Sequence, residues 1–583
     1  MTAVTIFVIS IAYSNLIEHF PGGGGGYLVA TKLLGEKAGV VSGCALVVDY
    51  VLTISVSVAS ACDALYSFLP PHWSGTKLLA ACAALLFLLL LNLRGVKESV
   101  TFLVPIFLAF VALHVFMILY TVGSHLTALP GVFKDAGNDL SGSISALGFA
   151  PVAFILMRAY SMGGGTYTGI EAVSNGVGML REPRVQTGKR TMLLMSTSLA
   201  FTAGGILLGY LLVAAVPETG KTMNAVLLEN LYGGWGSSGK VLVILTLLSE
   251  AALLLVAAQT GFLDGPRVLS NMALDSWVPH SFSRLSDRLV TQNGVFLMGV
   301  AALATLIYTH GHITTLVVMY SINVFLTFSL TELGMARHWI VHRSTEPRWR
   351  SQLAIHGTGL VMCVSILCVT LHEKFLEGGW VTAVITTLTV ALCFRVRRHY
   401  REVGESLKGL EKILEAAPLA GEETRAGRID PKAPTAVLTV SSFSGYGLHH
   451  ILAIQRLLPG YFKNFVFVSV GVLDSGNFKG SDAIGHLETE KRAHLDKYVA
   501  WARQHGFDAE SRLALGTETI EVLEKTLVEL SREFPRMIVF TGKLIFKEER
   551  WYQPILHSET ANSLQRRLQF NGVQVVVLPV RVY

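Results

Sequence analysis

The chain has 583 residues, of which 51% are hydrophobic and only 15% are charged. A soluble globular chain carries about 25% charged residues, so this composition excludes an entirely soluble protein and indicates long apolar segments. The net charge of +6 comes from Lys and Arg gathered in certain loops. A nucleic-acid-binding protein would instead carry a basic patch on a soluble domain, so we expect no nucleic acid partner.

The apolar character of the chain changes abruptly near residue 395. Before this point, apolar blocks alternate with short polar loops, and after it the chain is charged and mixed. We therefore predict a membrane domain over residues 1–396, a linker over 397–432 and an α/β domain over 433–583. The six cysteines all lie inside apolar blocks without a CxxC pair, which favours buried apolar roles over disulfides or a metal site.

The apolar blocks are long enough to cross a bilayer, because a crossing helix needs about 20 residues. The apolar-run criterion predicts about eleven membrane helices. They lie near residues 3–20, 38–69, 78–93, 99–122, 146–178, 191–215, 239–263, 293–309, 313–337, 353–371 and 379–394.

Basic residues in the loops predict the orientation of these helices. Most loop Lys and Arg fall in one alternating set of loops, and only isolated lysines fall in the other set. Positively charged loops stay in the cytoplasm, so we expect a multi-pass protein of the inner membrane with a cytoplasmic C-terminus. The first predicted helix would then begin outside.

A carboxylate lies within the second apolar block, at Asp49. Thr53 and Ser57 follow it at helical spacing and share its face, and Tyr50 stands beside it. An intramembrane carboxylate is a candidate functional group, and hydroxyl and carboxylate oxygens suit a hard monovalent cation. The alternative is that Asp49 lies near the cytoplasm and pairs with a loop arginine.

Three consecutive glycines, Gly163, Gly164 and Gly165, interrupt the fifth apolar block and have hydroxyl residues on both sides. Glycine is a poor helix former, so the run predicts a discontinuous helix whose free backbone groups bind an ion or substrate. The alternative is a small-residue face for helix packing.

Two further polar side chains lie in apolar blocks. Glu171 follows the glycine run, and it could take up and release a proton because burial disfavours a charged carboxyl group. A carboxylate facing water at a helix end explains Glu171 equally well. Tyr320 could offer its oxygen to a cation or gate the site, although an interfacial aromatic anchor is the alternative.

The C-terminal region alternates strand-like and helical patterns. Apolar runs at 436–440, 465–472, 512–515, 537–541 and 573–580 alternate with helical patterns at 450–458, 491–505 and 520–533. This alternation predicts βαβ units and a doubly wound parallel sheet. The region is similar to universal stress protein domains, and we expect a homodimerising regulatory domain. The glycine-rich nucleotide loop of those domains is missing after residue 541, which argues against nucleotide binding through that loop.

Several motifs, most of them rich in glycine, resemble the amino acid-polyamine-organocation superfamily of permeases. Together with the appended soluble domain, they most resemble the KimA-type potassium importers. The motifs are FPGGGGGY at 20–27, DYVLT at 49–53, GGGTYTGIEAVSNG at 163–176 and AAQTGFLDGPR at 257–267.

This resemblance implies an all-α inverted-repeat transporter fold, in which the chain begins at the second helix and the first is expected to be missing. It implies ion-binding roles for Asp49, Tyr50, Thr53, Thr168 and Tyr320. It also implies a proton-coupling role for Glu171. Members of this group are inhibited by cyclic di-AMP at their soluble domains, so a regulatory nucleotide is a possible partner.

The sequence therefore favours a secondary transporter, with proton-coupled potassium uptake (symport) as the leading hypothesis. An amino acid permease of the same fold and a non-transporting membrane sensor are the alternatives. No Gly-x4-Gly-Lys-Ser/Thr or covalent catalytic motif is found, so we expect neither an enzyme nor a bound cofactor.

Overall fold

The computed structural model describes residues 2–95, 99–167, 169–286, 289–416, 429–474, 481–546, 553–556 and 560–582. The chain forms two compact units, which we name the helical unit and the α/β unit. The helical unit contains Met1–Leu269 and Asn293–Ala391, and the α/β unit contains Ser270–Gln292 and Leu392–Tyr583. Residues 270–292, which follow a predicted membrane helix, thus group with the C-terminal part of the chain.

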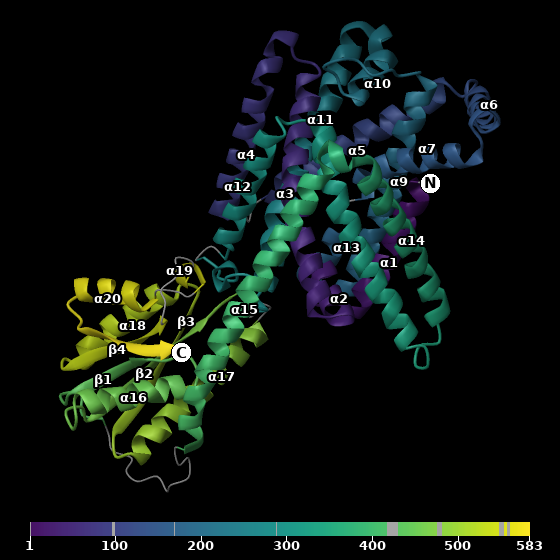
Figure 1. Cartoon of the computed structure of the whole chain (residues 1–583). Helices are drawn as coiled ribbons and strands as arrows, with labels where there is room; N and C mark the ends of the chain where they lie inside the picture. Colours follow the sequence, from purple (N-terminus) through teal and green to yellow (C-terminus); the bar gives the residue numbers. More distant parts are fainter. Residues whose placement is uncertain are drawn as a thin grey trace. The chain divides into compact units, whose positions relative to one another are not determined.

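The N-terminal two thirds of the chain is helical (Figure 1). Its α-helices are α1 (Thr2–His19), α2 (Gly25–Leu34), α3 (Glu36–Tyr66), α4 (Lys77–Arg94), α5 (Ser99–Ser124), α6 (Leu129–Leu147), α7 (Phe149–Met162), α8 (Ile170–Asn175), α9 (Arg184–Leu212), α10 (Met223–Tyr232), α11 (Gly236–Leu274), α12 (Gln292–Tyr308), α13 (Ile313–Val341), α14 (Trp349–Lys374) and α15 (Trp380–Ala416). Short turns of other helix types are η1 (Pro71–Thr76), η2 (Gly163–Tyr167), η3 (Val177–Met179), η4 (Gly233–Trp235), η5 (His280–Phe282) and η6 (Phe375–Gly379).

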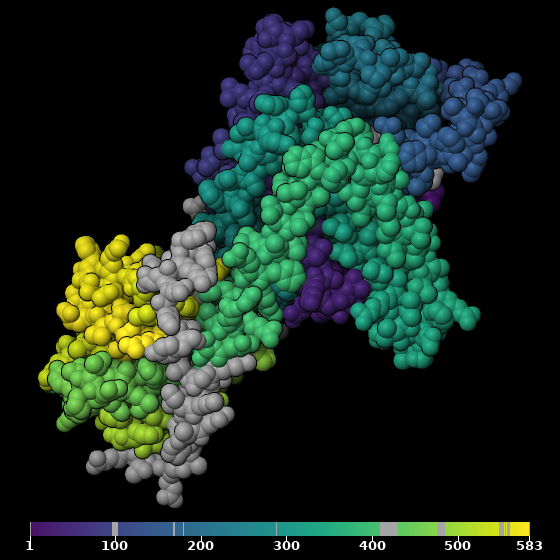
Figure 2. Space-filling view, viewed as in Figure 1, coloured from purple at the N-terminus to yellow at the C-terminus, as the bar shows by residue number. Residues whose placement is uncertain are grey.

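The described residues contain 8 helical stretches that are long and apolar enough to cross a membrane. One stretch joins α14 to α15, and two shorter apolar helices lie at Phe149–Ser161 and Gln292–Tyr308. A multi-pass membrane unit follows from this composition, because lipid can surround only segments whose backbone groups are satisfied internally. Large apolar side chains on α4 and α9, such as Phe87 and Leu194, are exposed as lipid contact requires. Figure 2 shows α4 and α14 on the surface of this unit.

Three helices of the helical unit were not predicted from apolar runs. α2 and α10 are each 10 residues long, too short to cross a membrane. α6 carries charged residues among its apolar ones and buries no residue. The apolar-run criterion misses such helices because it detects only long continuous blocks.

Helices α3 and α13 are the most buried of the long apolar helices, and they contact each other. Glycines on α11 bring a third helix close to α3. A Cβ atom at Gly261 would lie 2.7 Å from the backbone oxygen of Tyr50, so only glycine permits this approach. The position of Tyr50 on α3 is therefore constrained by the close approach of α11.

The C-terminal part of the chain forms a five-stranded parallel sheet in the order β3-β2-β1-β4-β5. The strands are β1 (Thr435–Thr439), β2 (Asn464–Val472), β3 (Asp508–Gly516), β4 (Met537–Phe546) and β5 (Val575–Val582). The helices between them are α16 (Gly445–Leu457), α17 (Ser481–Gln504), α18 (Thr519–Glu533), α19 (Gln553–Leu556) and α20 (Thr560–Phe570). The predicted α/β character of this region is confirmed.

Alternating side chains of the strands build a core on each face of the sheet. Leu438 on β1 packs with α16 and α17, whereas its neighbour Val437 packs with α18 and α20. Helices therefore cover both faces, which is why the strands are apolar on both sides. β4 continues to Phe546, well past the predicted end at 541, because it pairs with β5 as far as Phe546 and Val582.

Candidate functional site

The helix that contains the glycine run is discontinuous. α7 ends at Met162, the 3₁₀ turn η2 covers Gly163–Tyr167, and α8 starts after Gly169. Gly169 has a left-handed backbone with a φ of 85°, which only glycine adopts readily. The predicted ligand Thr168 lies outside the described residues.

The glycines of the break allow α13 to approach. A Cβ atom at Gly164 would lie 2.7 Å from the ring of Phe325, and one at Gly165 would lie 3.9 Å from the ring of Tyr320. Helix discontinuity and close packing, which were alternative explanations of the run, therefore occur together. Tyr320 faces the break and is buried, so it does not occupy the position of an interfacial anchor.

Asp49 and Tyr50 are both buried in the middle of α3, and Asp49 is only 2% exposed. The Asp49 Oδ1 atom has no hydrogen-bond partner among the described residues. The alternative in which a loop arginine neutralises Asp49 is thus not seen among these residues. Thr53, one turn further along α3, lies near the Tyr320 phenol. Carboxylate, phenol and hydroxyl oxygens from α3 and α13 therefore come together.

Glu171 lies in the first turn of α8 and is 3% exposed. The backbone N–H of Gly169 donates to Glu171 Oε1 at 3.2 Å, whereas Oε2 has no partner among the described residues. Glu171 also interacts electrostatically with Asp49. Two buried carboxyl groups in one site require a cation or a proton for compensation, because like charges out of water repel strongly.

Asn175 belongs to this site, although its role was not predicted from the sequence. Its Nδ2 atom donates to the Tyr50 Oη atom at 2.5 Å, which links α8 to α3. The signal in the sequence was its spacing, because Asn175 follows Glu171 by one helical turn. Its partner on α3 could not be found without the structure.

Asp264 on α11 is a second unpredicted neighbour of the site. It is buried and accepts a hydrogen bond from Arg267 Nη1 at 2.9 Å. It also interacts electrostatically with Tyr50 and Glu171. In the sequence, Arg267 reads as a loop residue, and the motif that contains Asp264 stands out only for its glycines. We interpret Asp264 as a carboxyl group whose negative charge influences Tyr50 and Glu171.

The glycine segment between α1 and α2 packs directly against Asn175. A Cβ atom at Gly25 would overlap the Asn175 Oδ1 atom, and the Gly25 φ of 48° is also unfavourable for other residues. The backbone N–H of Gly24 donates to the Asn175 carbonyl at 3.5 Å. This segment therefore holds the side chain that contacts Tyr50.

Replacing Gly25 by alanine is expected to destabilise the helical unit by about 1–3 kcal/mol, because the left-handed backbone is strained and Asn175 must move. Thermal unfolding of the purified chain in detergent measures this effect. Gly22→Ala is the matched control, since a Cβ atom there meets nothing within 4 Å. Equal unfolding temperatures for the two variants would contradict the packing described above.

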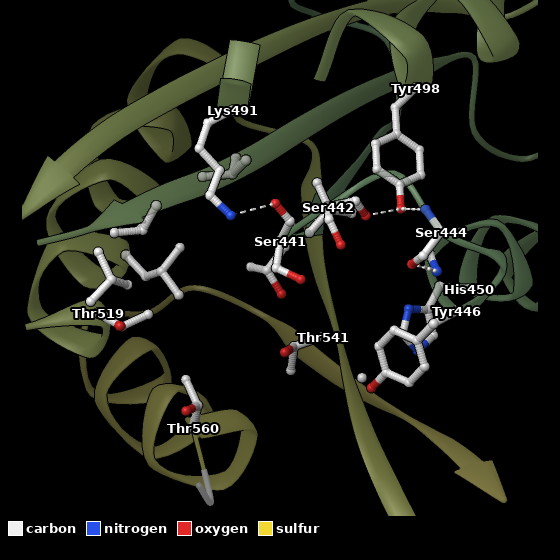
Figure 3. Close-up of a pocket in the computed structure, with 18 of the residues that line it drawn as sticks. Ser441, Ser442, Ser444, Tyr446, His450, Lys491, Tyr498, Thr519, Thr541 and Thr560 are labelled. Atoms are coloured by element: carbon white, nitrogen blue, oxygen red, sulfur yellow. Dashed lines mark hydrogen bonds between the residues drawn. The ribbon is translucent and has the colours of Figure 1, made fainter. Parts of the chain in front are cut away.

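A separate cavity of about 540 Å³ lies in the α/β unit, at the carboxyl ends of β1 and β2 and beside the middle of β4 (Figure 3). β1 is central, and the chain leaves it towards β2 on one side while β4 lies on the other. A position where the strand order reverses in this way is a topological switch point, and ligands of open parallel sheets bind at such points. Hydroxyl groups from the β1–α16 connection and from helices α18 and α20 face the cavity.

Lys491 and Tyr498 on α17 hold the loop that follows β1. Lys491 Nζ donates to the Ser441 carbonyl at 3.1 Å, and Tyr498 Oη donates to the Ser442 carbonyl at 2.8 Å. Ser444 then caps α16 by accepting from the Gly447 N–H. The cavity thus combines a cationic side chain with a helix N-terminus, which together favour an anion.

His450 on α16 closes one side of the cavity, beside Tyr446. Burial lowers the pKa of His450 to about 4, so its imidazole is neutral near pH 7. Its Nε2 atom has no hydrogen-bond partner among the described residues. Gly542 on β4 leaves room for this ring, because a Cβ atom there would overlap it. Residues 542–546 form strand instead of a phosphate-binding loop.

Comparison with known proteins identifies relatives of this chain. Residues 1–392 match the family model described as amino acid permease. The chain is also similar to a Bacillus subtilis protein named potassium transporter KimA, with 29% identity over 434 residues. That alignment covers 72% of this chain and 68% of the relative.

Proposed function

The chain belongs to the amino acid permease family, and from this premise we propose that it imports potassium together with protons as a secondary active transporter. The family model covers residues 1–392, and the apolar helices make the protein a multi-pass membrane protein. The sequence-based prediction of a permease-type membrane transporter is thereby confirmed. The transported ion and the coupling to protons are our proposals.

The observation that carries the proposal is the pair of buried carboxyl groups, Asp49 and Glu171, beside the hydroxyl-bearing side chains of α3 and α13. Potassium is a hard cation that prefers oxygen ligands, and Asp49 with Tyr50, Thr53, Thr168 and Tyr320 would supply them. Glu171 would carry the coupled proton. The name of the Bacillus subtilis relative supports the same ion.

Transport of an amino acid is the second candidate. A carboxylate substrate needs free N–H groups at the start of a half-helix, while Asp49 could receive its amino group. At the start of α8, however, the Gly169 N–H already donates to Glu171. Because this N–H donor is occupied, the site favours a bare cation over an amino acid. A membrane sensor that transports nothing would have no need of two carboxyl groups buried away from water.

Growth of a potassium-uptake-deficient bacterial host tests the proposal. Expression of the chain is expected to restore growth at limiting potassium, and the rescue should weaken when a protonophore collapses the proton gradient. Absence of growth rescue, with the protein present in the membrane, would contradict potassium uptake. Uptake of an amino acid by the same cells would favour the second candidate.

We propose that the protein lies in the inner membrane and that the α/β unit is a cytoplasmic, dimerising regulatory domain. The cavity at the switch point of its sheet supports a phosphate-bearing nucleotide as the regulator. Lys491 and the serine hydroxyl groups after β1 would contact the phosphate, and neutral His450 would bind an uncharged part of the ligand.

Replacing Lys491 by alanine is expected to weaken nucleotide binding by about tenfold or more, because a hydrogen bond to a charged group contributes about 1.5–3 kcal/mol. Titration of the full chain in detergent with ATP and with cyclic di-AMP measures this change. Lys463→Ala is the matched control, since Lys463 precedes β2 at the opposite edge of the sheet. Failure of both nucleotides to bind the unmodified chain would contradict this proposal.

A further inference from the structure

Two ionisable side chains form a buried pair between α13 and α14. The Nδ1 atom of His356 lies 2.6 Å from Oε2 of Glu332, and each side chain is only 1% exposed. Gly359 makes room for this pair, because a Cβ atom there would lie 3.2 Å from Glu332 Cδ. Ionisable groups at membrane depth are costly and mark a functional hypothesis.

This pair is distant from the candidate ion site. Glu332 follows Tyr320 by 12 residues on α13, a rise of about 18 Å along an α-helix. It lies towards the end of α13 that precedes the basic loop at 342–348, the end expected to face the cytoplasm. Neither residue is needed to bind the ion, so their burial calls for a separate explanation.

Buried hydroxyl groups extend from the ion site towards the pair. Thr327 lies two turns from Tyr320 on the same face of α13, and Ser42 lies two turns from Asp49 on the same face of α3. They converge at Gly26 of α2, where a Cβ atom would lie 2.8 Å from Thr327 Cγ2 and 3.5 Å from Ser42 Oγ. Neither hydroxyl oxygen has a partner among the described residues. Ordered water molecules usually supply the missing hydrogen bonds of such buried hydroxyl groups.

Tyr13 on α1 connects these hydroxyl groups to the pair. It is fully buried, and neither its hydroxyl nor that of Thr331 has a hydrogen-bond partner among the described residues. The Thr331 hydroxyl lies 3.0 Å from the Cβ position at Gly26, and water can join such unsatisfied groups. Tyr13 also interacts electrostatically with both Glu171 and Glu332. A phenol can accept one proton while it donates another, so Tyr13 is suited to link the two carboxyl groups.

Further imidazoles continue from the pair towards the end of α13. The His356 ring lies 6.5 Å from the Trp339 ring, which in turn contacts His338 at 5.3 Å and His19 at 5.0 Å. His342 lies 4.2 Å from His338. Among the described residues, the other titratable groups that interact with the pair are Tyr13 on α1, Cys363 on α14 and His338 on α13.

We propose that Glu332 and His356 form a second intramembrane proton site that releases the coupled proton to the cytoplasm. The proton leaves the Glu171 carboxyl group, passes along water and the hydroxyl groups of Thr327, Thr331 and Tyr13, and binds the Glu332–His356 pair. From there it passes to cytoplasmic water near the histidines at the end of α13. This inference rests on the proposed potassium–proton symport and assigns the exit route of its proton.

The competing explanation is structural, since the pair also joins α13 to α14. Potassium–potassium exchange, in which labelled and unlabelled potassium ions cross the membrane without net movement, distinguishes a proton site from a structural link. Exchange requires ion binding and conformational change, but it does not require proton release. In liposomes that contain the full chain, Glu332→Gln is expected to reduce proton-driven potassium accumulation by about tenfold or more, as loss of a proton relay should. Potassium–potassium exchange should remain near the unmodified level.

His356→Gln is expected to behave in the same way, with fewer protons entering per potassium ion, as an internal pH dye reports. Glu250→Gln is the matched control, because Glu250 is another helical carboxylate, partly buried and bonded to Asn224 at 3.0 Å. Equal loss of exchange and accumulation in Glu332→Gln, or no change in either, would overturn the inference. If the unmodified chain moved no potassium, the proposed function itself would fail instead.

Discussion

Replacing Asp49 by asparagine is expected to reduce potassium uptake by about a hundredfold or more. Asp49 is a buried carboxylate of α3 whose Oδ1 atom has no hydrogen-bond partner among the described residues, and in the proposed function the bound ion supplies its compensating charge. Removing one member of a buried charge pair costs about 3–5 kcal/mol, which corresponds to about a hundredfold or more in affinity. Initial rates of rubidium or potassium uptake in liposomes measure this loss.

Asp63→Asn is the control for this prediction, because Asp63 lies on the same helix but pairs with Lys77 at 2.5 Å near the surface. Its uptake should remain close to that of the unmodified chain. Similar uptake by the Asp49→Asn variant would show that Asp49 does not bind the transported ion. A loss in both variants would point to damage to α3.

The second large effect is expected for Glu171→Gln. The amide keeps the hydrogen bond from the Gly169 N–H but cannot bind and release a proton. Proton-driven potassium accumulation should therefore fall by about a hundredfold, within the range for loss of a proton-transferring group. Potassium exchange should persist and lose its dependence on external pH.

These quantities are measured in liposomes with and without an inward proton gradient. Glu182→Gln is the control, because the exposed Glu182 pairs with Arg184 shortly after the break. A Glu171→Gln variant that still accumulates potassium against its gradient would exclude Glu171 as the coupling group.

The sequence predicted those structural features that depend on one continuous segment of the chain. Asp49 and Thr53 are one helical turn apart, so their shared face follows from spacing alone. The glycine run at Gly163 predicted a helix break from local backbone preference. The parallel sheet of the C-terminal region likewise followed from the alternation of strands and helices.

Features that depend on contacts between distant segments were not predictable. The hydrogen bond between Asn175 and Tyr50 joins residues 125 positions apart, and the pair of Glu332 with His356 depends on how α13 packs against α14. The extension of β4 to Phe546 depends on its pairing with β5. In each case the sequence contains suitable residues but no local pattern that identifies their partner.

The most direct test of potassium–proton symport is transport by the purified full chain in liposomes under an imposed inward proton gradient. We predict that rubidium accumulates together with protons, that external potassium competes with it, and that amino acids do not. Accumulation of an amino acid under the same gradient, without uptake of rubidium or potassium, would contradict the proposed function.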